Sequence, residues 1–273
     1  PVTINQAIST GSALLNTDSA NIREVNNLKK YKTAEVAAIV GIHPNTVRLY
    51  EEWGMITKPE RQENGYRIFT DLHIMQIKLA RTAFQIEILQ NGLRKKIVEI
   101  VKTTATGDYD RAILLTEEYL KQLQQERYNA EEAIQVVHDV LSGSEDTKML
   151  CMKRKEVSEY LNISMDTLRN WEMNGLIQVK RRQNGYRVYT NDDIKILKII
   201  RSLRCANYSL ESILHMLQQL IHNSNTDIRA ALNTPNSNDD IISVCDRLIL
   251  SLTAAEDNAR KIIEMLYEMK NLF

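Results

Sequence analysis

Turn-forming residues and cysteine are scarce in this sequence. It contains 9 glycines and 4 prolines among 273 residues, and folds built from strands and turns usually need more, so helix is favoured. Its three cysteines, Cys151, Cys205 and Cys245, are about 40 or more residues apart and form no CxxC or Cys/His cluster. A disulfide scaffold or a local zinc module is therefore not expected, and scattered thiols are typical of a reducing cytoplasm.

A long apolar run and an excess of one charge sign are also missing. No stretch approaches the roughly 18 residues of a membrane span, and the first residues do not have the basic-then-apolar order of a secretory signal. Lys+Arg and Asp+Glu are both 35, so the formal net charge is zero. This balance excludes a polybasic or acidic tail protein, although it allows a local basic face. We expect a cytoplasmic protein without a membrane partner.

Two segments of the chain repeat one another. Residues 31–81 align with residues 152–201. The offset is 121 residues as far as Gln62 and Gln183, and it is 120 beyond them, because the first copy has one extra residue just before NGYR. A repeat of this size indicates duplication of a whole domain and not a solenoid of short units.

Each copy predicts a short helix, a tight turn and a second helix. The first helix is expected at about 33–40 in one copy and at about 154–161 in the other. The second helix begins at Pro44, a residue favoured at the first helical position, or after Ser164, a residue favoured as an N-cap. In both copies this helix is expected to end at a glycine. The two glycines are Gly54 and Gly175.

Two short strands and a third helix follow in each copy. The Asn-Gly pair in ENGYRIF and in QNGYRVY is a strong signal for the turn of a hairpin. Thr70 or Thr190 then opens the third helix, and Thr190 forms a capping box with Asp193 by sequence. Helix, turn, helix and hairpin in this order are the plan of a winged helix-turn-helix.

Each copy then continues into a long helix with regularly spaced apolar residues, which follow steps of 4-3-4-3. In the first these are Tyr109, Ile113, Leu120, Leu123, Ala130, Ile134, Val137 and Leu141, with Thr116 and Arg127 at the intervening places. In the second these are Ile241, Cys245, Leu248, Leu252, Ala255, Ala259, Ile262, Leu266, Met269 and Phe273. A heptad seam of this length predicts a coiled coil about 50 Å long. A long helix inside an ordinary bundle is the alternative.

The expected fold is mainly α, with two winged helix-turn-helix heads that each have a small β-hairpin wing, and two long helices. The expected segments are a loose N-terminal arm at 1–30, a first head and connector at 31–100, a first long helix at 108–141, a linker at 142–152, a second head and connector at 153–222, and a second long helix at 239–273.

Charge is distributed unevenly between heads and long helices. Counting Lys+Arg minus Asp+Glu, the heads are basic: residues 29–67 have seven minus five, or +2, and residues 153–187 have eight minus four, or +4. The long helices are acidic: residues 108–141 have three minus eight, or −5, and residues 239–270 have four minus seven, or −3. This arrangement would orient the heads toward a polyanion and the long helices away from it.

The most specific part of each copy is its second helix with the hairpin. These elements read TVRLYEEWGMI with NGYRIFT in the first copy and TLRNWEMNGLI with NGYRVYT in the second. Both resemble the recognition helix and wing of the MerR family of bacterial transcription regulators, and the resemblance extends over about 31–141 and 151–273. It implies a winged head, a helical connector and a long helix that pairs antiparallel with that of another protomer. It also implies promoter DNA, which members distort in response to an effector, and RNA polymerase as candidate partners.

Polar and aromatic side chains of these elements are the expected DNA contacts. Arg48 and Arg169 lie in the second helix, where a guanidinium can reach phosphates or base edges. Arg67 and Arg187 follow the wing turn beside a tyrosine, so that a cation and a ring can straddle a minor-groove backbone. The complete predicted set is Asn45, Arg48, Tyr50, Arg61, Tyr66, Arg67, Asp166, Arg169, Trp171, Arg181, Arg182, Tyr186 and Arg187.

Four positions on the second helices allow two interpretations each. Tyr50 and Trp171 either contact DNA or fill the small core between helices. Glu51 and Glu172 would repel phosphate, so they either support the helix or orient a nearby arginine.

The link between the two copies is short. The first long helix ends near Leu141 and the second head begins near Lys153, with Ser142-Gly143-Ser144 between them. About ten flexible residues span roughly 19 Å on average, which suits a second copy that supplies the partner helix from within the same chain. We therefore expect a monomer that folds as a pseudo-dimer with one intramolecular antiparallel coiled coil.

Two classes of function are compatible with these features. A DNA-binding transcription regulator is favoured, because both heads retain the arginines and the wing. The alternative is a ligand-sequestering, drug-binding protein that keeps the MerR-like fold without promoter regulation; DNA binding with a steep salt dependence would separate the two. A small apolar effector is a candidate partner in either case.

Catalytic and metal-binding patterns are not found in the sequence. It has no P-loop, GxSxG or HExxH motif, so we expect no enzyme activity and no cofactor. His215 and His222 are seven residues apart on one helical face, but a structural role is favoured over a metal pair. The chain also departs from the metal-sensing members of the MerR family, which have cysteines near the far end of the long helix, so no metal site is predicted.

Overall fold

The structure is a computed structural model that describes residues 29–86, 91–142, 151–179, 187–224 and 241–273. These residues form mainly helices, and they divide into two compact units. The first unit contains the described residues up to Arg81 together with Val101–Ala112 and Met265–Phe273; the second contains the described residues within Thr82–Ile100 and Ile113–Glu264. The expected N-terminal arm lies almost entirely outside the described residues.

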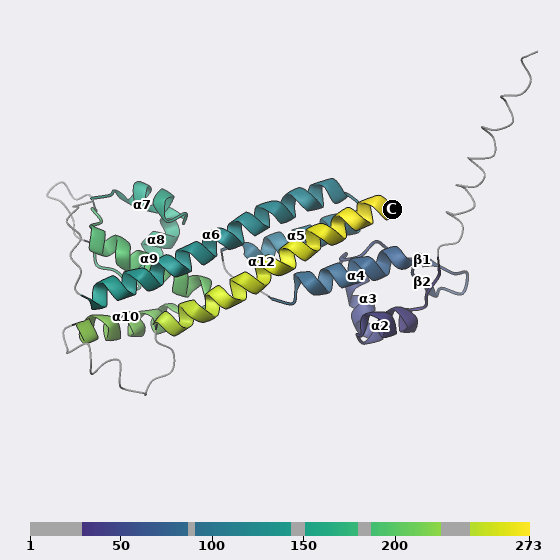
Figure 1. Ribbon diagram of the computed structural model, residues 1–273, viewed down its shortest axis with the longest axis horizontal. Helices are drawn as coiled ribbons and strands as arrows, with labels where there is room; N and C mark the ends of the chain where they lie inside the picture. The colour runs from purple at the N-terminus through teal and green to yellow at the C-terminus, as the bar shows by residue number, and fades with distance from the viewer. Residues whose placement is uncertain (1–28, 87–90, 143–150, 180–186, 225–240) are drawn as a thin grey trace, which may run out of the picture. The chain divides into compact units, whose positions relative to one another are not determined.

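The first unit begins with a helix-turn-helix and a hairpin (Figure 1). Its elements are α2 (Thr33–Val40), α3 (Pro44–Glu52), β1 (Glu60–Arg61), β2 (Arg67–Ile68) and α4 (Asp71–Ala83), which continues beyond the unit. The two strands pair antiparallel. The predicted order of helix, turn, helix, hairpin and helix is therefore confirmed in the first copy.

Local signals explain where the helices of this unit begin and end. Gly41 has a φ of 70°, a left-handed conformation that glycine adopts without strain, and it ends α2. Pro44 takes the first position of α3, as predicted, and the ring Nδ1 of His43 accepts a hydrogen bond from the backbone N–H of Asn45 at 3.2 Å. Beyond α3, Gly54 also has a left-handed φ of 66°, although the helix itself ends two residues earlier, at Glu52.

A small apolar core holds these elements together. Its buried members are Val36, Ala37, Val47, Ile56, Phe69, Ile74 and Ile77. An isolated bridge between Tyr31 and Phe69 ties the start of α2 to the end of the hairpin. The core thereby fixes the base of the wing against the helix-turn-helix.

The connector helix α5 (Leu93–Ala105) meets this unit at its C-terminal end. The hydroxyl of Thr57 donates to the carbonyl of Ala105 at 2.7 Å, and the side-chain amide of Gln76 donates to the carbonyl of Thr104 at 3.3 Å. The helix extends five residues beyond the expected segment end at 100. Gly107, which has a left-handed φ of 81°, follows it and donates its backbone N–H to the carbonyl of Thr104 at 3.1 Å.

The second unit contains the corresponding head of the second copy. Its helices are α7 (Arg154–Tyr160), α8 (Met165–Met173), α9 (Asn191–Cys205) and α10 (Leu210–Ser224). The turn of the expected second wing, at 180–186, lies outside the described residues.

Two predicted caps of the second head are confirmed. The hydroxyl of Ser164 accepts a hydrogen bond from the backbone N–H of Thr167 at 3.0 Å and opens α8. Thr190 and Asp193 form the capping box of α9, with the Asp193 carboxylate accepting from the backbone N–H of Thr190 at 2.8 Å. Each cap satisfies a backbone donor that the helix itself leaves free.

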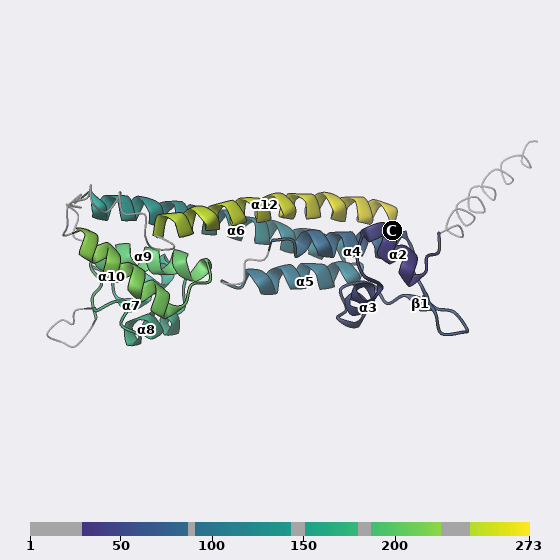
Figure 2. The same cartoon turned by 90° about the horizontal axis from the view of Figure 1, so that it is seen from below.

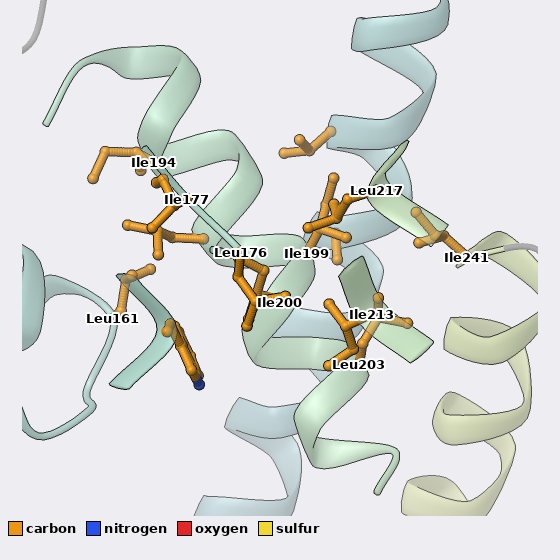
Figure 3. Close-up of a cluster of buried hydrophobic side chains, with 14 of the residues drawn as sticks. Leu161, Leu176, Ile177, Ile194, Ile199, Ile200, Leu203, Ile213, Leu217 and Ile241 are labelled. Carbon is orange, nitrogen blue, oxygen red and sulfur yellow. The ribbon is translucent and has the colours of Figure 1, made fainter. Parts of the chain in front are cut away.

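The core of this unit combines residues from α7–α10 with residues from the two long helices. Figure 3 shows Leu161, Leu176 and Ile177 of the helix-turn-helix facing Ile194 and Ile200 of α9, with Ile213 and Leu217 of α10 on the other side. Val136 and Val137 of α6 and Val244 of α12 complete the same cluster.

The two long helices, α6 (Tyr109–Leu141) and α12 (Ile241–Leu272), run antiparallel within the second unit (Figures 1 and 2). The end of α6 shares a hydrophobic cluster with the start of α12, and Arg127 in α6 binds Glu256 in α12 at 2.8 Å. Every apolar position of the predicted seam in α12 is buried except Phe273, which is exposed just beyond the end of the helix. Burial in α12 therefore follows the 4-3-4-3 spacing. In α6 it follows the spacing only in part, because Tyr109, Leu120, Ile134 and Leu141 of the predicted seam are half-buried, whereas Tyr119 and Ala133 beside it are buried.

Helix α6 also contacts the second head directly. Its Glu126 carboxylate accepts a hydrogen bond from each terminal amino group of Arg201 in α9, both at 2.8 Å, and both side chains are buried. Lys198, three residues before Arg201 in α9, binds Glu132, six residues after Glu126 in α6, at 2.8 Å. The long helix of the first copy is thus packed on the head of the second copy.

Candidate nucleic-acid interface

The first recognition helix, α3, presents polar side chains at its N-terminal turns. Asn45 and Arg48 are both exposed, and the Arg48 guanidinium donates to the side-chain oxygen of Asn45 at 3.0 Å. The helix places them together because residues three apart lie on one face. Leu49, which follows them, is an exposed apolar side chain.

The second recognition helix, α8, presents a different set at matched positions. Asp166 and Arg169 are exposed, and neither has a hydrogen-bond or ion-pair partner in the described part of the chain. Asn170 accepts from the side-chain amide of Asn174 at 2.8 Å. The predicted residues Asn45, Arg48, Asp166 and Arg169 thus all reach solvent.

In the first head, the wing is joined to the recognition helix by a glutamate. Glu51 of α3 accepts from the Nε of Arg67 on β2 and from Arg61 on β1, the latter at 3.4 Å. Arg61 also donates to the carbonyl of Gly65 in the wing turn at 3.4 Å. Tyr66 is 71% exposed at the same turn. Two predicted cations and the recognition helix therefore form one connected surface.

In the second head, Glu172 of α8 has the corresponding position and more partners. It binds the Nε of Arg187 at 2.9 Å and Arg154 of α7 at 2.6 Å, and it also accepts from the hydroxyl of Tyr189. Burial and this bond to Glu172 raise the pKa of Tyr189 to about 12, so its hydroxyl stays protonated and donating. The other predicted wing residues, Arg181, Arg182 and Tyr186, lie outside the described residues.

Both wing arginines keep part of their guanidinium for another acceptor. Arg67 and Arg187 each use Nε toward the glutamate, and their terminal amino groups have no partner among the described residues. Because the guanidinium is planar, fixing one edge also fixes the direction of the other. Of the two roles open to Glu51 and Glu172, the contacts favour that of orienting an arginine.

The two aromatic positions of the recognition helices have different surroundings. Trp171 is 3% exposed and belongs to the core of the second head. Tyr50 is half-buried against the core of the first head, and burial raises the pKa of its hydroxyl. Of the two interpretations left open by the sequence, core packing therefore holds for Trp171 and in part for Tyr50.

Two segments of the chain match profiles of known regulator families. The profile of the MerR HTH family regulatory proteins matches residues 152–220, and that of the MerR family regulatory proteins matches residues 32–69. The uncharacterized HTH-type transcriptional regulator YyaN of Bacillus subtilis is 32% identical over 93 residues, which are 33% of this chain and 67% of that protein. The chain belongs to the MerR family.

Other curated regulators match a shorter stretch of the chain or match it at lower identity. The HTH-type transcriptional regulator CueR of Escherichia coli O157:H7 is 43% identical over 53 residues, 19% of this chain and 39% of CueR. The mercuric resistance operon regulatory protein of Bacillus cereus is 26% identical over 97 residues, 35% of this chain and 74% of that protein. The chain thus spans well under two thirds of CueR. No solved structure matches the chain significantly.

Two partners of Glu172 were not identified from the sequence. Arg154 and Tyr189 replace Thr33 and Phe69 of the first copy, according to the offsets of the repeat. Aligning the two copies position by position shows that the second head has a cation and a phenolic hydroxyl at two positions where the first head has neither. This difference is the sequence signal for the two additional partners of Glu172.

The clefts of the second unit differ from an apolar effector pocket. Two clefts of about 450 Å³ each share Asn162 and Arg201, and amide, hydroxyl and charged side chains form most of their walls.

Among the described helices, none is long and apolar enough to cross a membrane.

Proposed function

We propose that this protein is a sequence-specific DNA-binding transcription regulator that binds promoter DNA through two non-identical winged helix-turn-helix heads. One observation carries the proposal: in each head, the glutamate three residues after the exposed arginine of the recognition helix binds the Nε of a wing arginine. A guanidinium held in this way is already oriented before it meets a phosphate, whereas a mobile surface arginine is not. Distortion of the promoter in response to an effector, and RNA polymerase as a partner, belong to the same proposal.

The two heads act as a pseudo-dimer within one chain. Support comes from the second unit, where α6 of the first copy packs on α9 of the second copy and runs antiparallel to α12. The long 4-3-4-3 seam favours coiled-coil packing between α6 and α12. The protein is accordingly a tandem repeat of two MerR-like halves, acting as a cytoplasmic monomer without enzyme activity.

The wing arginines give a direct test of DNA binding. Arg67→Ala and Arg187→Ala should each weaken binding to all sequences and should flatten the slope of log K against log salt by about one, because each removes one phosphate contact. The double variant E51Q/R67A shows whether an uncovered glutamate adds repulsion. Lys261→Ala, an exposed site on α12, is the matched control and should leave the slope unchanged.

Two results would contradict this proposal in different ways. If affinity and slope stay unchanged in both arginine variants, the wings do not contact phosphate. If the intact protein binds no duplex at low salt while it binds apolar drugs, the ligand-sequestering alternative replaces the regulator.

A further inference from the structure

The two recognition helices present different side chains at matched places. Five pairs related by the 121-residue offset are exposed in both helices or at their N-caps. The pairs are His43 with Ser164, Asn45 with Asp166, Arg48 with Arg169, Leu49 with Asn170, and Glu52 with Met173. Only the arginine is shared, so the chemistry facing a DNA groove differs between the heads.

Helix α3 presents mainly hydrogen-bond donors. The side-chain oxygen of Asn45 is occupied by Arg48 at 3.0 Å, so the pair offers the amide N–H groups and the remaining guanidinium N–H groups. In the major groove, guanine shows two acceptors, O6 and N7, and no donor. A guanine at this place is therefore the best complement to α3.

Helix α8 presents an acceptor at the matched place. Asp166 is a carboxylate, which only accepts hydrogen bonds when ionised, and it has no partner among the described residues. It complements the N4 amino group of cytosine and repels the acceptors of guanine. The same position in the two heads therefore favours opposite bases.

We propose that the operator of this protein consists of two unlike half-sites in a fixed order, with guanine opposite the Asn45–Arg48 pair and cytosine opposite Asp166. The inference rests on the proposed function. A homodimer presents two identical recognition helices and prefers a palindrome. This chain carries two different helices on one polypeptide, so a palindrome satisfies only one of them.

Selection from random duplexes, followed by titration of defined duplexes, tests the proposal. The selected composite operator should bind more tightly than either palindrome made from one of its halves. Each palindrome carries at least one mismatched half-site position, which corresponds to about 5- to 150-fold weaker binding. Recovery of a palindrome as the tightest site would overturn the inference and leave DNA binding intact. Failure to select any sequence would overturn the proposed function itself.

Reciprocal variants assign each half-site to its head. Asn45→Asp should change guanine to cytosine in one half-site, and Asp166→Asn should change cytosine to a base with an acceptor in the other half-site. Glu264→Gln, at an exposed site on α12 outside both recognition helices, is the control and should leave both half-sites as in the parent protein. If either exchange variant selects the parent sequence, the base assignment is wrong.

Discussion

Glu51 and Glu172 show what a single residue can reveal once its neighbours are known. From the sequence, a glutamate on a DNA-facing helix would repel phosphate. Its role could therefore be either to support the helix or to orient a nearby arginine. The partners come from strands and helices that are distant in the sequence, such as Arg67 for one and Arg187 for the other. Spacing along one helix could not have identified them, because the wing turn decides which side chains return to α3 or α8.

His73 gives the first head a pH dependence. It takes the N3 position of α4, where its Nδ1 accepts from the backbone N–H of Thr70 at 3.0 Å, and its buried Nε2 has no partner among the described residues. Burial lowers its pKa, although the charges of Glu51 and Glu60 oppose this. The unfolded chain therefore binds the proton more readily, and stability should fall as the pH drops below about 6.5.

The variant His73→Gln tests this linkage. Glutamine keeps an acceptor at N3 for a capping box but does not titrate. Urea unfolding between pH 5 and 8 should show a smaller loss of stability at acid pH than in the parent protein. Identical pH profiles for the two proteins would contradict a proton-linked role for His73.

The three cysteines should differ sharply in reactivity. Burial and the nearby charge of Glu126 together raise the pKa of the Cys205 thiol to about 12. Cys245 is buried as well, whereas Cys151 is exposed. A thiol reagent should therefore modify one cysteine quickly in the folded protein and the others only on unfolding, since the thiolate is the reactive form. The fast phase should disappear in Cys151→Ser; its persistence would contradict the burial of the other two.

At the scale of elements, the buried pair of Glu126 and Arg201 joins α6 to α9. Removing one member leaves the other charge buried, so Glu126→Ala should cost about 3–5 kcal/mol of unfolding free energy. The matched control is Glu131→Ala, which breaks the exposed pair with Arg127 and should change stability by about 0.5 kcal/mol or less. Urea denaturation measures both.

A double variant separates the cost of an unpaired charge from the value of the pair. E126L/R201M removes both charges and should be less destabilised than Glu126→Ala, because apolar side chains can fill the same space. If the double variant is the least stable of all, the pair contributes net stability and the expected sign is wrong.

Most element boundaries could be predicted because they depend on local chemistry. Pro44, Ser164 and the Thr190 box begin helices through contacts within three residues. The sequence could not show that Thr57 and Gln76 from the head bind the last carbonyls of α5. Tertiary hydrogen bonds of this kind leave no periodic signal.

At the scale of the whole molecule, the sequence predicted that each long helix needs a long partner, because its seam is too extended for one small head to cover. The structure adds that α6 packs on α9 as well as on α12 in the second unit. The seam alone could not reveal this, since Glu126 lies beside the predicted seam and reads as an ordinary surface charge.

The central claim is that one chain supplies both DNA-binding heads. Sedimentation equilibrium of the protein with a duplex that carries the selected operator tests it most directly. We expect a monomer of 31.5 kDa in free solution at micromolar concentration, and a complex of one chain per duplex in which footprinting shows both half-sites protected. Two chains per duplex, or a free dimer whose dissociation abolishes binding, would contradict the account.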